Sequence, residues 1–179
     1  HAAWEDVFNV ELLNKRFYRE LANWYFWALP QVDFPADIEM DDEKRRATGL
    51  IRLLTRLIFC WFLKEKGLIP DKLFAEDELK EILRDLSPAA STYNEAILQN
   101  LFFATLNQRM GKDKNGQPYR AFATDEGFQK NRATYGVDTL YRYEGHFRDP
   151  ATALEHFADV PFLNGGLFEC LDKPVEVGG

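Results

Sequence analysis

Positively charged residues gather in two stretches of an otherwise acidic chain. The net charge is −7, yet bases outnumber acids in residues 44–66 and 109–132. In the first stretch Arg45, Arg52 and Arg56 follow one another at spacings of seven and four, which places them near one stripe of a helix. Such a stripe of cations is sufficient to bind the phosphates of a DNA backbone. The alternative is that these arginines form ion pairs with acidic helices of the same chain.

The second basic stretch lies in and beside the polar segment GKDKNGQPYR. Its Asn115-Gly116 pair is a turn signal, so we expect a small β-hairpin or a loop there. Its cations either follow a DNA backbone or are only solvated. The DNA-backbone candidates of the whole chain are therefore Arg45, Arg52, Arg56, Lys112, Lys114, Arg120, Lys130 and Arg132.

A metal-dependent nuclease is one alternative chemistry. Pro70-Asp71 and Glu78-Leu79-Lys80 resemble a PD…ExK pattern, which needs carboxylates and a lysine on adjacent strands around Mg²⁺. Glu78 and Lys80 fall in a segment with helical character, where positions i and i+2 point to different sides. A solvated helix face is therefore the favoured interpretation.

Two further patterns are weaker. His146 and His156, with Glu144 and Glu155, lack a third ligand at zinc-like spacing, so we favour ordinary surface or core histidines. Asn164-Gly165-Gly166 is able to form a phosphate-binding nest. The favoured interpretation is a turn that lets the flanking Phe162, Leu163, Leu167 and Phe168 pack on the helices.

Apolar periodicity predicts the helices that must position these residues. We expect helices over about 9–29, 42–66, 76–86 and 91–110. The second is apolar over most of its circumference, so it is expected at the centre of the fold. Gly67 suits the position just after its end, and Pro70 blocks its continuation.

The remaining chain is predicted to be less regular. We expect a weak helix over 124–132, a short strand or irregular chain over 138–147, and a last short helix over 150–158. The fold class is mainly α, an irregular bundle around the helix at about 42–66, with helices one and four packed against it. Residues 1–158 are expected to form the helical domain, and residues 159–179 a non-helical tail.

The amino-acid composition limits the classes of protein to which this chain can belong. A chain of 179 residues that is 46% hydrophobic and 15% aromatic is able to bury a bulky core in one domain. Cys60 and Cys170 are far apart and fit reduced, structural thiols. The longest apolar run, 57–63, is far shorter than the roughly 20 residues that a membrane span needs. We therefore expect no membrane contact and a cytoplasmic location.

Four segments resemble one family. They are FNVELLNKRFYRELANWYFWAL, LTRLIFCWFLKEKGLIP, YNEAILQNLFFATLN and VPFLNGGLFE, and they cover nearly the whole chain. In this order they resemble a helical region of large single-chain type II restriction–modification enzymes of bacteria. In that family the helical region precedes an adenine-specific DNA methyltransferase domain that binds S-adenosylmethionine.

The resemblance also shows what this chain lacks. The family's catalytic tetrapeptide, Asn/Asp-Pro-Pro-Tyr/Phe, is absent, and no Gly-rich cofactor loop follows a strand. We therefore assign no catalytic, metal or cofactor-binding residue here. The resemblance implies a non-catalytic spacer or DNA-contacting domain that precedes a methyltransferase domain downstream of Gly179. S-adenosylmethionine is expected to bind to that downstream domain. The implied partners are DNA, through the parent enzyme, and that downstream domain. The alternative is a helical protein–protein interaction module with no DNA role.

Overall fold

The structure is a computed structural model that is mainly helical, as predicted, and no β-strand occurs among the residues it describes. The chain divides into two compact units, residues 1–54 and 55–179, and the division falls inside a helix. Side chains are described from Asn14 onward. The described ranges are residues 2–34, 41–87, 89–123, 139–163 and 166–168.

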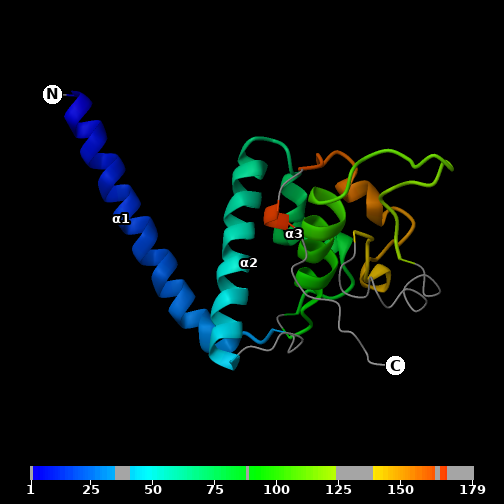
Figure 1. Cartoon of the computed structure of the whole chain (residues 1–179), viewed down its shortest axis with the longest axis horizontal. Coiled ribbons are helices and arrows are strands. Elements are labelled where there is room, and N and C mark those ends of the chain that lie inside the picture. The colour runs from blue at the N-terminus through cyan, green and yellow to red at the C-terminus, as the bar shows by residue number, and fades with distance from the viewer. Residues whose placement is uncertain (1, 35–40, 88, 124–138, 164–165, 169–179) are drawn as a thin grey trace. The chain divides into compact units, whose positions relative to one another are not determined.

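The first unit holds α1 (Ala2–Ala28), the 3-10 turn η1 (Leu29–Gln31) and the first half of α2 (Asp42–Glu65) (Figure 1). The start predicted at Asn9 is wrong, because α1 already begins at Ala2; the preceding residues contain good helix formers and no helix breaker. The predicted helix over about 42–66 is confirmed as α2. Its first turn carries Asp42 and Glu43, whose charges suit the positive end of the helix dipole.

A close approach explains a glycine inside α2. A Cβ atom on Gly49 would lie 2.7 Å from the ring of Phe34. Glycine normally costs helix stability, but here it makes room for the aromatic ring. The prediction that helix one packs on helix two stays a prediction.

The second unit begins with the end of α2. Gly67 has a φ of +70°, and the Leu68 amide donates to the Leu63 carbonyl at 2.9 Å. This left-handed glycine after the last helical turn is the predicted helix stop. The chain continues through η2 (Asp71–Leu73) into α3 (Glu76–Ile82).

Helix α3 ends before the predicted residue 86. After Ile82 the backbone pairs with a distant segment, since Leu83 forms an isolated antiparallel bridge with Phe147. The Arg148 amide also donates to the Ile82 carbonyl at 2.9 Å. This pairing takes up backbone groups that another helical turn would have used.

The fourth predicted helix is present as a π-helix, η3 (Tyr93–Leu106), shorter than the predicted 91–110. Its buried residues occur on nearly every side, so apolar periodicity does not distinguish a π-helix from an α-helix here. The buried residues of η3 are Ala96, Ile97, Leu98, Asn100, Leu101, Phe102, Ala104, Thr105 and Leu106.

Short turns complete the second unit: η5 (Glu144–His146), η6 (Ala153–Phe157) and η7 (Gly166–Phe168). The predicted last helix over 150–158 is therefore a 3-10 segment. Turn η7 lies against η3 (Figure 1). The weak helix predicted over 124–132 lies outside the described residues.

An aromatic chain joins α2 to η3 within this unit. The ring of Phe168, which is 1% exposed, lies 5.8 Å from Phe59 and 5.9 Å from Phe102. The Leu163 amide donates to the Leu106 carbonyl at 2.8 Å. Of the side chains predicted to pack on the helices, Phe168 is buried, whereas Phe162 and Leu167 are each 37% exposed.

Burial is concentrated on η3 more than on α2. Helix α2 buries Leu50, Cys60 and Leu63, whereas several of its large apolar side chains remain on the surface. These exposed side chains are Ile51, Ile58, Phe59, Trp61 and Phe62.

Candidate nucleic-acid interface

In the first unit, Arg45 follows the ion-pair alternative. Its Nη1 atom lies 2.8 Å from Asp42 Oδ1 and its Nη2 atom 3.8 Å from Asp33 Oδ1, with its side chain 13% exposed. Arg52 is half-buried, and among the described residues no ion pair of its guanidinium is found. Of these two, Arg52 is the better candidate for a phosphate.

In the second unit, Arg56 belongs to the packing between helix and tail. Its Nε donates to the Leu167 carbonyl at 2.9 Å, and its guanidinium lies 5.0 Å from the Phe103 ring centre and 5.7 Å from that of Phe102. A guanidinium over aromatic faces is held by cation–π attraction. Arg56 therefore has a structural role that the sequence did not indicate.

Residues 109–119, here called the basic turn, form a tight loop closed by one antiparallel bridge between Lys112 and Pro118. The Asn115-Gly116 signal is confirmed, since Gly116 has a φ of +81°. The Asp113 carboxylate accepts from the backbone amides of Asn115 at 2.8 Å and Gln117 at 2.9 Å. This carboxylate is therefore turned inward to order the loop.

The cations of the basic turn face solvent. Lys112 and Lys114 are exposed, and neither forms an ion pair within the described part of the chain. Arg109 is also exposed, with its guanidinium 5.4 Å from the centre of the Tyr119 ring. Arg109 was not among the predicted DNA contacts, because it was expected at the end of a helix. The turn thus presents three cations from a short, ordered loop.

Arg120 occupies the base of the basic turn and is half-buried. Its Nη2 donates to the Thr105 carbonyl at 2.7 Å, and its Nη1 to the Val160 carbonyl at 2.8 Å. Burial lowers the pKa of Arg120, an effect that Tyr141 partly offsets. The structure thus places this candidate inside the fold. Lys130 and Arg132 lie outside the described residues.

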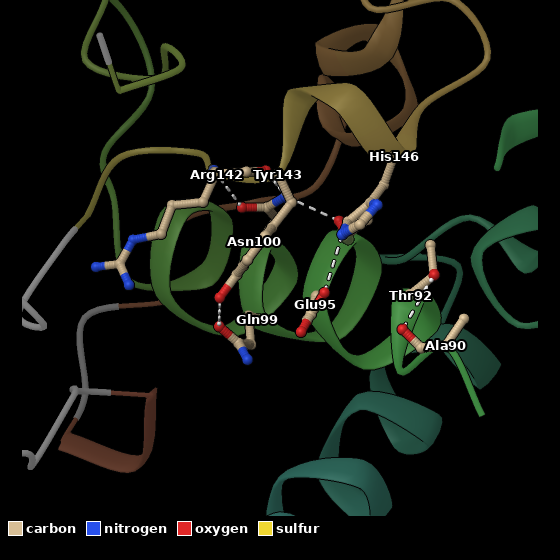
Figure 2. A network of polar contacts seen from close by, with 9 residues as sticks. Ala90, Thr92, Glu95, Gln99, Asn100, Arg142, Tyr143 and His146 are labelled. Carbon is tan, nitrogen blue, oxygen red and sulfur yellow. Dashed lines mark hydrogen bonds and ion pairs between the residues drawn. The ribbon is translucent and has the colours of Figure 1, made fainter. Parts of the chain in front are cut away.

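A polar network docks residues 142–146 onto η3 (Figure 2). The buried Asn100 donates from Nδ2 to the carbonyls of Ala96 at 2.8 Å and Arg142 at 2.9 Å. Its Oδ1 accepts from the Arg142 amide at 2.9 Å. One side chain thus satisfies both backbone groups of Arg142, which would otherwise lose their bonds to water on folding.

The same network includes His146, whose Nε2 lies 2.9 Å from Glu95 Oε2. Tyr143 has a φ of +60°, a region that is strained for a side chain of this kind. Its ring stacks on His146 at 5.7 Å, and its hydroxyl donates to Gln99 at 3.4 Å. These contacts hold the strained residue in place. The sequence held no signal for the pairing, because the partners are far apart along the chain.

The nuclease alternative finds no support in the local geometry. Glu78 and Lys80 lie on α3, and Lys80 Nζ pairs with Glu76 at 2.8 Å and Asp77 at 3.6 Å. Asp71 pairs instead with Lys64 at 3.5 Å. Within the described ranges, no group of three His, Cys, Asp or Glu side chains is arranged to hold a metal ion.

The thiol of Cys60 is buried and free. Burial raises its pKa to about 12, against a smaller opposing effect of Arg56. A thiol of this kind is unreactive at neutral pH, as expected for a structural cysteine. The Asn164-Gly165 part of the possible phosphate nest, like Cys170, lies outside the described residues.

None of the helices in the described ranges combines the length and apolar character that spanning a membrane requires. No protein-family model matches the chain, and no significant match is found among curated proteins or solved structures.

Proposed function

We propose that this chain is a non-catalytic helical region of a DNA restriction–modification enzyme, and that it contacts the DNA backbone through the basic turn. The observation that carries the proposal is the combination of exposed Arg109, Lys112 and Lys114 with the inward-turned carboxylate of Asp113. Phosphates require cations that are not already neutralised by the protein. An ordered loop of this kind meets that requirement.

The assignment to a restriction–modification enzyme rests on the resemblance of the four sequence segments. In the proposed parent enzyme, a domain downstream of Gly179 transfers a methyl group from S-adenosylmethionine to adenine in DNA. The fragment itself neither methylates DNA nor binds that cofactor. Heat released on titrating S-adenosylmethionine into the isolated chain, with saturation at one site, would contradict this part.

The experiment that tests DNA contact is binding of the chain to double-stranded DNA over a series of salt concentrations. Backbone contacts release counterions, so the logarithm of the affinity is expected to fall linearly with the logarithm of the salt concentration. Arg52→Glu is expected to weaken binding further if the helix stripe also contributes. If the chain binds no DNA even at low salt, the proposed DNA contact is wrong.

A second candidate is a helical protein–protein interaction module. It is favoured by the aromatic side chains that α1 leaves on the surface, where Tyr18, Phe26 and Trp27 are 67%, 69% and 62% exposed. Apolar surface of this extent marks sites that partners cover. If the chain is such a module, we expect no salt-dependent DNA binding. We also expect association with a partner protein that Trp27→Glu abolishes.

A further inference from the structure

Arg120 ties the base of the basic turn to two other segments of the second unit. Its Nη2 and Nε atoms donate to the Gln108 carbonyl at 3.1 and 3.2 Å, in addition to the bond from Nη2 to Thr105. Its Nη1 donates to the carbonyls of Val160, at 2.8 Å, and Phe157, at 3.4 Å. All three guanidinium nitrogens are thus used inside the protein.

The carbonyls that Arg120 binds lie at the ends of two helical segments. Thr105 is in the last turn of η3 and Gln108 lies two residues beyond its end, where fewer backbone amides remain to bind carbonyl groups. Phe157 and Val160 lie at the end of η6 and just beyond it. The planar fork of N–H groups joins these two ends in one arrangement, which the single ammonium of lysine cannot reproduce.

The turn is thereby held at both of its ends. Arg120 fixes its base, while the Asp113 carboxylate fixes its tip through two backbone amides. The Tyr119 amide closes the loop by donating to the Gly111 carbonyl at 3.0 Å. A loop that is ordered before binding loses less entropy when it meets its ligand.

We propose that Arg120 is a positioning residue, which holds the basic turn in its DNA-binding conformation and makes no contact with DNA itself. This inference rests on the proposed function and changes the role of a residue that the sequence suggested as a phosphate ligand. The shape of the guanidinium matters here, because its donors are used by carbonyls. The lysines of the turn carry the contact with phosphate.

The experiment compares Arg120→Lys, Arg120→Gln and a control, Arg148→Gln, in DNA binding over a salt series well below the unfolding midpoint. Arg148 is exposed and donates to a single carbonyl, that of Lys80, at 2.7 Å. Both Arg120 variants are expected to bind DNA about threefold to tenfold more weakly, because the turn loses its order before binding. The salt slope is expected to stay unchanged, because no contact with phosphate is lost. The control is expected to keep the wild-type affinity.

A direct phosphate contact gives the opposite pattern. Arg120→Lys would then bind like wild type, and Arg120→Gln would lower the salt slope by about 0.9. That result would overturn the proposal. An unchanged affinity of both variants would overturn it as well.

Hydrogen exchange of the turn amides gives a readout without DNA. The amides of Asp113, Gly116 and Tyr119 donate to carbonyls within the turn and are expected to exchange faster in Arg120→Lys than in wild type. If wild type binds no DNA, the proposed function fails, and this exchange decides alone whether Arg120 orders the turn. Equal exchange rates would overturn the positioning role.

A variant at the tip covers the case in which neither Arg120 variant folds. Asp113→Ala loosens the turn from its exposed side and also removes a negative charge. If order in the turn supports DNA binding, Asp113→Ala is expected to bind DNA more weakly than wild type in spite of its more favourable charge. Unchanged or tighter binding would overturn the proposal.

Discussion

Replacing both lysines of the basic turn by glutamine is expected to remove two phosphate contacts. Lys112 and Lys114 are exposed and form no ion pair within the described residues, so both charges are available to DNA. At about 0.9 per contact, the salt slope is expected to fall by about 1.8. If the two affinities are equal at about 1 M salt, this difference in slope corresponds at about 0.1 M salt to a loss of affinity on the order of 60-fold.

Fluorescence anisotropy with a labelled duplex of mixed sequence measures both quantities over one salt series. The matched control is Lys72→Gln with Lys80→Gln, which changes the net charge equally. Lys80 already pairs with Glu76 on the acid-rich helix α3, so this control is expected to keep the wild-type slope.

Two results would refute the reasoning. An equal fall in slope for both double variants would mean that DNA senses only the overall charge of the protein. An unchanged slope for the variant of the turn would mean that DNA binds elsewhere or not at all.

Three further predictions concern the fold that carries the turn. Asn100→Ala removes the hydrogen bonds of a buried side chain to Ala96 and Arg142, so urea unfolding should show a loss of about 2–5 kcal/mol. Exposed Asn94→Ala should stay within about 0.5 kcal/mol of wild type. Because burial raises the pKa of Cys60 to about 12, iodoacetamide should label it slowly at pH 8 in the native chain and quickly in denaturant, as peptide mapping shows; fast native labelling would contradict its burial. Burial, with Lys72 nearby, lowers the pKa of His156 in the folded chain. On acidification the unfolded chain therefore protonates this histidine first, and the free energy of unfolding should fall as the pH drops below about 6.5. His156→Gln should reduce that fall, and an equal fall in the variant would exclude this histidine as its source.

Local sequence signals predicted the positions of most helices. The glycine stop at Gly67 and the turn at Asn115-Gly116 each rest on a left-handed backbone position, which glycine tolerates and most residues do not. The position of α2 along the chain followed from its apolar run. Such signals act over a few residues, so the sequence alone reveals them.

Tertiary pairing decided the features that the sequence did not predict. Helix α3 ends early because Leu83 pairs with Phe147, far along the chain. The π-helical form of η3 is not encoded in its apolar pattern, which is nearly uniform around the helix. One polar contact within it follows the wider turn, since the Thr105 hydroxyl donates to the Asn100 carbonyl, five residues back, at 2.8 Å.

The candidate site was predicted in part. The sequence indicated Lys112 and Lys114 from their place beside a turn signal, and the structure finds both exposed on an ordered loop. The sequence did not distinguish these lysines from Arg56 and Arg120. Charge alone does not show whether a guanidinium donates to carbonyls inside the fold or faces solvent. Arg45 proved to be ion-paired, but with Asp42 of its own helix and with Asp33 rather than with a separate acidic helix.

Lysine footprinting shows whether DNA lies against the basic turn. The chain is acylated with and without double-stranded DNA, and the modified lysines are identified by mass spectrometry. We expect DNA to protect Lys112 and Lys114, whereas Lys80, on the acidic helix α3, should react equally in both samples. Equal reactivity of the two turn lysines with and without DNA, under conditions where DNA is bound, would contradict this expectation.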